Sequence, residues 1–263
     1  MSVLDTIVAA HRQAAESDQR DCEELFLVAA GLPAPRPFVA ALRKQNNGSP
    51  PEPISVIAEI KRRSPSKGDL CPHLDASVVA SEYQAGGADA LSVLTDAGYF
   101  GGSVEDLTRA RSGCSLPVLR KDFTVDPRDI ADARIMGADA VLLIAAALVD
   151  EDLADFADRA AALGMAALVE VHDETELRRV LDLGVTVVGV NQRDLKTFAV
   201  DRHRAAKLAE RIPADVIRVA ESGIGGPEDL VRLADAGYDA VLVGEHLITA
   251  ADRTIALRQL RAG

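Results

Sequence analysis

The chain has 263 residues, of which 48% are hydrophobic and 27% are charged, a composition typical of soluble globular proteins. Its formal net charge of −12 argues against nucleic acid or an anionic membrane as the main partner, because both favour a basic surface. The three cysteines, Cys22, Cys71 and Cys114, are widely spaced, so they indicate neither a disulfide framework nor a zinc site and favour a reducing cytoplasm. No stretch resembles a signal peptide or a membrane-spanning helix, and we expect neither export nor membrane insertion.

The first 50 residues do not fit the repeat that follows them, and we expect an N-terminal helical extension packed on the rest of the protein. Helical patterns run near 2–17 and 36–44, with prolines at 33, 35 and 37 between them. The polar segment 46–51 (NNGSPP) is typical of a hinge. We therefore divide the chain into an extension, 1–50, and a catalytic domain, 51–263.

Eight short apolar runs in the second part have the character of β-strands. They cover residues 54–60, 90–94, 117–121, 140–144, 166–171, 186–191, 217–221 and 240–243. Their starts lie 20 to 36 residues apart, which leaves room for a strand, a loop and a helix in each unit and predicts a parallel sheet. Amphipathic patterns at 150–163 and 227–236 are examples of the helices between them.

Three of these strands begin with nearly the same sequence: Gly87-Ala-Asp-Ala90, Gly137-Ala-Asp-Ala140 and Gly237-Tyr-Asp-Ala240. Glycine can end a helix in the left-handed conformation, so these segments are predicted to be equivalent turns from helix to strand. Eight such α/β units in about 210 residues predict a closed eight-fold parallel (β/α) barrel, the TIM barrel. A doubly wound sheet is the alternative.

Polar residues collect where the predicted strands end: Glu59, Lys61, Lys121, Glu170, Asn191 and Glu221. In a barrel the carboxyl ends of the strands surround one mouth, where catalytic residues lie. Lysines and carboxylates that are close together shift each other's pKa, as proton-transfer catalysis requires. Any one of them could equally be a structural ion pair, but six coincident positions favour a catalytic cluster.

A phosphate site is predicted at the loops after the last two strands. One loop is Glu221-Ser-Gly-Ile-Gly-Gly226 and the other is Gly244-Glu-His246. Glycines let backbone N–H groups approach an anion, and barrels frequently bind phosphate at this place. The glycines alone are explained better by a tight turn, and Glu228 replaces the third glycine of a dinucleotide fingerprint.

The loop after the first strand, 62–68 (RRSPSKG), is basic and could close over an anionic substrate as a lid. A solvated loop without a role is the alternative. His172 follows Glu170 by two residues, where a supporting role is favoured over catalysis. The other four histidines lack the spacing of metal ligands, and we expect no metal and no cofactor.

Seven motifs occur in order at the predicted strand ends. They are IAEIKRRSPSKG (57–68), SVLT (92–95), PVLRKDF (117–123), ALVEVH (167–172), GVNQRDL (189–195), AESGI (220–224) and VLVGE (241–245). Together they resemble the indole-3-glycerol phosphate synthase family from about residue 36 to the end, whereas the first 35 residues match it poorly. The resemblance implies a carboxy-lyase of tryptophan biosynthesis. Its reaction converts 1-(2-carboxyphenylamino)-1-deoxyribulose 5-phosphate into indole-3-glycerol phosphate, carbon dioxide and water.

The resemblance also implies a role for each residue of the mouth. Lys121 would be the general acid and Glu170 the general base, with Glu59 in support. Lys61 would hold the substrate carboxylate and donate a proton in the dehydration.

Two further residues, Asn191 and Glu221, would orient the sugar hydroxyls. The positions implied to contact phosphate are Ser64, Ser222, Gly223 and Gly244. The other positions implied to form the pocket are Ser92, Phe100, Phe123, Arg193, Leu195, Leu242 and Glu245. Glu245 would repel a phosphate, so we expect its side chain to point away.

Two other functions remain as alternatives. A phosphoribosylanthranilate isomerase-like enzyme needs an aspartate and a cysteine at the strand ends, and neither Cys71 nor Cys114 lies at one. A non-catalytic barrel could bind a phosphorylated metabolite, or a partner protein, through the same loops. We expect a small phosphorylated molecule as the partner and a chain that acts as a monomer or, at most, a weak homodimer.

Overall fold

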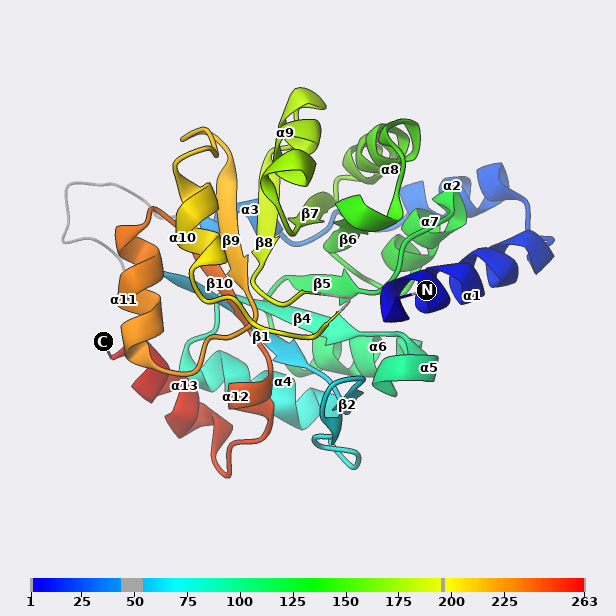
Figure 1. The fold of residues 1–263 in the computed structure, drawn as a ribbon. Coiled ribbons are helices and arrows are strands. Elements are labelled where there is room, and N and C mark those ends of the chain that lie inside the picture. The colour runs from blue at the N-terminus through cyan, green and yellow to red at the C-terminus, as the bar shows by residue number, and fades with distance from the viewer. Residues whose placement is uncertain (1, 44–53, 195–196, 263) are drawn as a thin grey trace.

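The computed structural model describes residues 2–43, 54–194 and 197–262. Eight parallel strands close into a barrel in the order β1-β10-β9-β8-β7-β6-β5-β4 (Figure 1). They are β1 (Ser55–Ile60), β4 (Ala90–Leu94), β5 (Val118–Lys121), β6 (Ala140–Ile144), β7 (Ala166–Val171), β8 (Val187–Asn191), β9 (Ile217–Glu221) and β10 (Ala240–Val243). Because β1 pairs with both β4 and β10, the predicted TIM barrel is confirmed and the doubly wound sheet was wrong.

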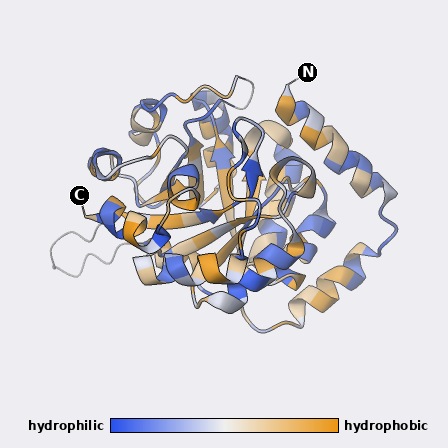
Figure 2. Cartoon of the chain, turned by 90° about the horizontal axis from the view of Figure 1, so that it is seen from below, coloured by the Kyte–Doolittle hydropathy of each residue, from blue (hydrophilic) through white to orange (hydrophobic). Residues whose placement is uncertain are grey.

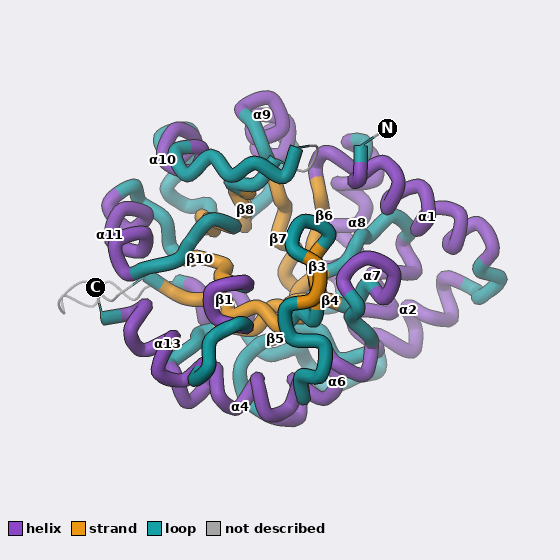
Figure 3. Tube along the Cα trace, turned by 60° about the horizontal axis from the view of Figure 1, so that its bottom comes forward, coloured by secondary structure: helices purple, strands orange, loops and turns teal. Residues whose placement is uncertain are grey.

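Helices surround the barrel, as the tube view shows (Figure 3). They are α4 (Ala76–Gly86), α6 (Val104–Gly113), α7 (Pro127–Ile135), α8 (Asp150–Ala162), α9 (Glu174–Asp182), α10 (Arg204–Ala209), α11 (Pro227–Asp235) and α13 (Arg253–Arg261). The predicted helices 150–163 and 227–236 are confirmed as α8 and α11, each ending one residue earlier. The loops add short elements that the sequence did not predict: β2 (Arg63–Ser64), β3 (Gly68–Asp69), α5 (Ala97–Phe100), the 3₁₀ helix η1 (Ala145–Ala147) and α12 (Glu245–Ile248).

The hydrophobic core has two layers, because each strand points alternate side chains into the barrel and toward the helices. The inner cluster includes Ile57, Leu119 and Leu168, and the larger outer cluster lies between strands and helices. In a view turned by 90°, the strands at the centre are predominantly hydrophobic and the helices around them carry hydrophilic stretches (Figure 2). The barrel interior is therefore a packed core, and a ligand can bind only at its ends.

A short helix, α3 (Phe38–Leu42), closes the amino end of the barrel. Phe38 and Leu42 belong to the inner cluster, and the carbonyl of Leu42 accepts a hydrogen bond from Ser55 Oγ at 3.3 Å at the start of β1. The helix predicted at 36–44 is shorter than expected, since it begins after Pro37, and residue 44 lies outside the described residues.

The three repeated turns anchor the amino ends of neighbouring strands. Asp89, Asp139 and Asp239 each accept a backbone N–H at 2.8 Å, from Val56, Val118 and Arg218 respectively. The glycine two residues earlier in each turn has φ between 87° and 96°, the left-handed conformation that was expected. The three similar sequences therefore form the same turn, in which an aspartate side chain accepts a backbone N–H of the neighbouring strand.

The N-terminal segment contains α1 (Val3–Ser17), as predicted, and α2 (Cys22–Ala30), which was not predicted. Asp21 caps α2 by accepting the N–H of Glu24, and this cap was the signal that the sequence offered. Helix α2 packs against α7 on the barrel. The expected hinge at 46–51 lies outside the described residues, so the division at residue 50 stays a prediction.

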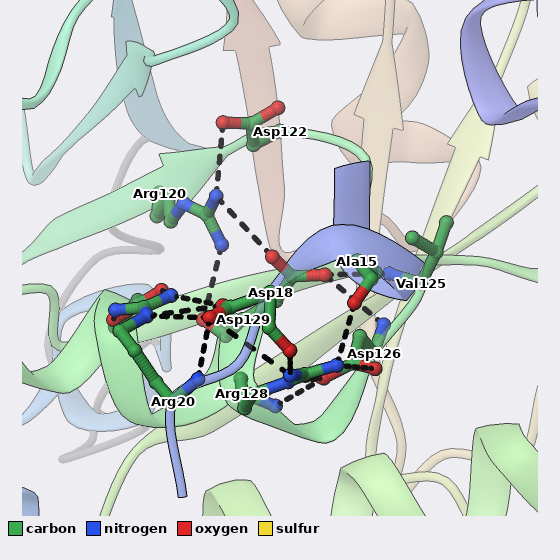
Figure 4. Close-up of polar contacts among 10 residues, drawn as sticks. Ala15, Asp18, Arg20, Arg120, Asp122, Val125, Asp126, Arg128 and Asp129 are labelled. Atoms are coloured by element: carbon green, nitrogen blue, oxygen red, sulfur yellow. Dashed lines mark hydrogen bonds and ion pairs between the residues drawn. The ribbon is translucent and has the colours of Figure 1, made fainter. Parts of the chain in front are cut away.

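A polar network fastens the end of α1 to the start of α7 (Figure 4). The Arg128 guanidinium donates to the carbonyls of Ala15, at 2.8 Å, and Asp18. Arg20 bridges Asp18 and Asp132 in the same region. The extension is therefore held on the side of the barrel where β5 ends.

None of the helices in the described ranges has the length and apolar character of a membrane span.

Candidate active site

A cavity of about 520 Å³ opens at the carboxyl ends of the strands, a size suited to a small metabolite. All six predicted catalytic residues line it: Glu59, Lys61, Lys121, Glu170, Asn191 and Glu221. They come from β1, β5, β7, β8 and β9 and the residue that follows β1. Side chains far apart in the sequence meet here because the strand ends of a barrel share one rim.

Lys121 lies at the centre of the cluster. Its Nζ is 2.8 Å from Glu170 Oε2 and 3.2 Å from Glu221 Oε2, and both glutamates are only 2% exposed. Strand β5 alternates its faces, so Leu119 and Lys121 point inward whereas Arg120 points outward and donates to Asp122 at 3.0 Å (Figure 4). The charged end of this strand thus contributes Lys121 to the cavity and Arg120 to a polar network outside it.

The charges of this cluster shift each other's pKa. Burial lowers the pKa of Lys121, but the carboxylates of Glu170, Glu221 and Glu59 raise it by more than burial lowers it. The pKa is therefore raised overall, and the ammonium stays charged. Burial raises the pKa of Glu170, yet Lys121 and His172 lower it more, and Glu170 stays ionised. Burial raises the pKa of Glu221 above its usual value, and the charge of Glu170 adds to this rise, whereas Lys121 opposes it. The cluster therefore contains both a donor and an acceptor of protons.

A second ion pair lies beside the first. Lys61 Nζ is 2.5 Å from Glu59 Oε1, and both side chains are mostly buried. Gly244, at the end of β10, faces this pair: a Cβ there would overlap Glu59 Oε1 and approach Lys61 Nζ to 2.9 Å. Gly189, in β8, similarly leaves the space that Glu221 Oε1 occupies. Glycine at both positions lets buried charges lie directly against the backbone.

The predicted phosphate loops lie next to this pair. Ser222, Gly223 and Gly244 all line the cavity, as does Ser64 of β2. Ser222 and Gly223 have φ of 67° and 73°, and the carbonyl of Ser222 accepts a hydrogen bond from Gln192 at 2.7 Å. Ser222 is strained in this left-handed conformation, as residues at ligand sites often are, whereas Gly223 adopts it freely.

The basic loop after β1 is less available to a ligand than its composition suggested. Arg62 donates to Asp106 and Arg63 to the carbonyl of Gly98, so both guanidinium groups are held by the protein. Lys67 is exposed and lies 3.5 Å from Glu245. The Glu245 side chain, which was expected to point away from a phosphate, is about two-fifths exposed and faces this lysine. A closing movement of the loop stays a prediction.

The structure places some of the predicted pocket residues on the cavity wall and not others. Phe100, Phe123, Arg193 and Leu242 line the cavity, together with Glu245. Ser92 does not: it lies fully buried beside Glu59 in the sheet, so the structure does not place it on the wall. Leu195 lies outside the described residues.

Several lining residues were missed by the sequence reasoning: Leu94, Leu142, Ile144, Phe198, Arg202, His246 and Thr249. For Leu142 and Ile144 the alternation along β6 was an available signal, but an apolar residue at a strand end looks the same in a wall and in a core.

The rim also carries a polar cluster that the sequence did not predict. His11 of α1 lies 3.1 Å from Asp96 and 3.8 Å from Asp122, and its ring centroid is 5.4 Å from that of Phe123. Both aspartates already accept hydrogen bonds, Asp96 from the backbone of Tyr99 and Asp122 from Arg120. We interpret the cluster as the contact that holds α1 against the mouth.

A closed β/α barrel whose mouth joins a lysine to buried carboxylates, with glycine loops beside them, defines a TIM-barrel enzyme that moves protons on an anionic substrate. The particular family follows from comparison with known proteins. The family model of indole-3-glycerol phosphate synthase matches residues 4–260. The chain belongs to the indole-3-glycerol phosphate synthase family, a family of enzymes of tryptophan biosynthesis.

Relatives named indole-3-glycerol phosphate synthase match over most of their length. The protein of Parafrankia sp. (strain EAN1pec) is 51% identical over 84% of this chain and 80% of its own. That of Chloroherpeton thalassium is 47% identical over 95% of both chains, and that of Streptomyces griseus is 46% identical over 100% of this chain and 96% of its own. The family resemblance read from the seven motifs is thereby confirmed.

Solved structures at low identity support the fold alone. A 3-hexulose-6-phosphate synthase aligns with a TM-score of 0.64 at 18% identity, over 80% of this chain and 99% of its own. Thiamine phosphate pyrophosphorylase from Pyrococcus furiosus aligns with a TM-score of 0.59 at 17% identity, over 79% and 94%.

Proposed function

We propose that this cavity converts 1-(2-carboxyphenylamino)-1-deoxyribulose 5-phosphate into indole-3-glycerol phosphate, carbon dioxide and water, with Lys121 as general acid and Glu170 as general base. One observation carries this assignment: the Lys121 ammonium lies within 3.2 Å of two buried carboxylates inside the mouth. The reaction is that of the family to which the chain belongs, and the geometry of the cavity supports the roles of Lys121 and Glu170.

Ring closure comes first. The aromatic carbon that bears the carboxylate attacks the ketose carbonyl, and the carbonyl oxygen must gain a proton as the bond forms. Lys121, whose raised pKa keeps it charged, donates this proton and opposes the negative charge that develops on the oxygen. Lys61 holds the substrate carboxylate until it leaves as carbon dioxide, which restores the aromatic ring.

Dehydration completes the reaction. Glu170 removes a proton from the carbon next to the nitrogen, and the hydroxyl leaves as water after it receives a proton from Lys61, with Glu59 in support. Two protons thus go to oxygen and one leaves carbon, so each turnover from the carboxylate takes up one proton. Asn191 and Glu221 orient the sugar hydroxyls, and the position of Asn191 next to Glu221 in the sheet supports this pairing.

The substrate phosphate binds at the loops after β9 and β10. Ser222, Gly223 and Gly244 present backbone N–H groups and Ser64 adds a hydroxyl, and all four line the same cavity as Lys121. The substrate would then extend from the phosphate loops toward Phe100 and Phe123, whose ring centroids are 6.2 Å apart. These rings suit the aromatic end of the substrate.

The enzyme is proposed to act as a monomer or a weak homodimer in the cytoplasm. The described cavity lies within one barrel, at the carboxyl ends of its strands. Cys22, Cys71 and Cys114 are free, which supports a reducing compartment.

No observation favours an isomerase of the phosphoribosylanthranilate type. Cys71 and Cys114 pack against the outer core cluster and do not line the cavity. The remaining alternative is a barrel that binds a phosphorylated metabolite without chemistry, and it differs from the proposal in whether Lys121 is needed.

Replacement of Lys121 by alanine separates these two functions. We expect Lys121→Ala to lower indole-3-glycerol phosphate formation by at least about 100-fold, the lower end of a general acid's contribution, because the ketose oxygen loses its proton donor. Turnover is followed by the fluorescence of the indole product, and binding of the substrate is followed by calorimetry. Lys207→Ala, at an exposed lysine of α10, is the matched control and keeps its activity. Full turnover in Lys121→Ala, or none in the folded native protein, would contradict the proposal.

A further inference from the structure

We propose that His172 and Glu176 form a positioning pair that holds Glu170 ionised and correctly oriented in the cavity. This inference rests on the function proposed above, in which Glu170 is the general base. Neither His172 nor Glu176 lines the cavity, so the pair acts on the substrate only through Glu170.

The two oxygens of Glu170 face different cations. Oε2 is 2.8 Å from the ammonium of Lys121, and Oε1 is 3.4 Å from Nε2 of His172. The glutamate is 2% exposed, so water contributes little to holding it. A carboxylate fixed at both oxygens has one orientation, as a base requires if it is to remove a proton from one carbon.

His172 is fixed in turn by the first turn of α9. Glu176 Oε2 accepts the backbone N–H of His172 at 2.7 Å and lies 3.2 Å from its Nδ1. The backbone N–H of Glu176 donates to Asp173, the N-cap of α9, at 2.9 Å. Helix capping therefore determines where Glu176 lies, Glu176 orients the ring, and the ring directs Nε2 at Glu170.

The imidazole between these two carboxylates is charged. Burial lowers the pKa of His172, but hydrogen bonds and charges from Glu170 and Glu176 outweigh this effect and raise it to about 10. Its Nε2 is buried and lacks a well-aligned hydrogen bond, although Glu170 Oε1 is close. Contacts of this kind are often long in a free enzyme and shorten in the complex with substrate.

The other charges of the cluster show why Glu170 needs a second cation. Lys121, on β5, is shared with Glu221 on β9, and Glu59 on β1 also acts on it. His172 is the cation that faces Glu170 from its own strand end, and Glu176 on α9 faces His172. Without the imidazolium, Glu170 would depend on Lys121, which it shares with Glu221, so its pKa would rise.

The test uses the full chain with two variants and a control. His172→Asn removes the charge and keeps a polar side chain, whereas Glu176→Gln keeps an oxygen that can accept from the His172 backbone N–H and ring. His73→Asn, at an exposed histidine, is the matched control. Both kcat and KM are measured against pH, and thermal unfolding checks that each variant is folded.

In His172→Asn, kcat is expected to fall by about 10-fold, a part of what general base catalysis contributes, with KM unchanged. The acid limb of its kcat profile moves to higher pH, because a Glu170 with a raised pKa is protonated earlier as the pH falls. In Glu176→Gln the basic limb moves to lower pH, because His172 loses a carboxylate partner and gives up its charge earlier as the pH rises.

An unchanged kcat profile in folded His172→Asn would overturn the inference. If that variant does not fold, the Glu176→Gln profile decides, and an unmoved basic limb overturns it equally. A native protein with no turnover would instead reject the proposed function, so the two failures are distinguishable.

Discussion

The buried charges of the mouth depend on residues that have no side chain. Lys61 and Glu59 form an ion pair directly against Gly244, and the Glu221 carboxyl occupies the space beside Gly189. A charged pair in a mostly dry site is stable only when its geometry is closely kept. These glycines are therefore as much a part of the site as the charges.

A methyl group at Gly244 tests this dependence. We expect Gly244→Ala to lower kcat by about 10- to 100-fold, because its Cβ would displace the Glu59 carboxylate from Lys61 by a large fraction of an ångström. Steady-state kinetics measure the loss. Gly31→Ala, where the nearest atom is 3.5 Å from the added Cβ, is the control. Equal activity of the two folded variants would show that the Glu59 and Lys61 pair tolerates displacement.

The direction of a charged side chain could be predicted from the sequence where it depends on the alternation along a single strand. The alternation of faces along β5 was enough to direct Lys121 inward. The partners of His172 could not be found in this way, because Glu176 reaches it from a helix and depends on the cap at Asp173. The contact between His11 and Asp96 joins segments 85 residues apart, for which the sequence offers no local signal.

The repeated turns decide how the helix and strand units join. Each aspartate accepts a backbone N–H near the start of a neighbouring strand, but the three differ in what else they bind. Asp139 also accepts from the backbone of Arg36 at 2.6 Å and from the Arg111 guanidinium at 2.6 Å. It therefore joins three segments at the amino end of the barrel, whereas Asp239 accepts the N–H of Arg218.

This difference predicts that replacing Asp139 destabilises the protein more than replacing Asp239. Asp139→Asn should lower the free energy of unfolding by about 2 kcal/mol, since a buried charged acceptor is lost and Arg111 is left without its carboxylate partner. Asp239→Asn should lower it by about 1 kcal/mol. Urea denaturation of both variants gives the comparison. Equal losses would mean that the contacts to Arg36 and Arg111 do not contribute.

Long helices were predicted well, whether in the N-terminal segment, as α1, or between strands, and the shorter helices were predicted poorly. The α8 and α11 patterns were recognised because amphipathic periodicity extends over two turns or more. The cap of α2 was overlooked, and the four-residue helices α5 and α12 are too short to show periodicity. Their positions are determined by the loops of the mouth, which only the closed barrel brings together.

The molecule as a whole is a closed ring with a helix at one end and a reactive mouth at the other. Helix α3 fills the amino end through Phe38 and Leu42, and in the described part of the chain the cavity opens at the carboxyl end. The chain is acidic overall, yet the mouth contains Lys61, Lys121 and Arg193. These cations lie among the carboxylates Glu59, Glu170 and Glu221, so an anionic substrate meets positive charge at individual side chains of the mouth.

The central claim is that Lys121 and Glu170 form one ion pair on which both proton transfers depend, and a double-mutant cycle tests it most directly. The value of kcat is measured for the native protein, Lys121→Ala, Glu170→Gln and the double variant. Residues that act as a unit give non-additive losses, so the double variant should lie within about threefold of the less active single variant. Losses that multiply, so that the double variant falls by the product of the two single effects, would show that the two residues act independently and would contradict the account.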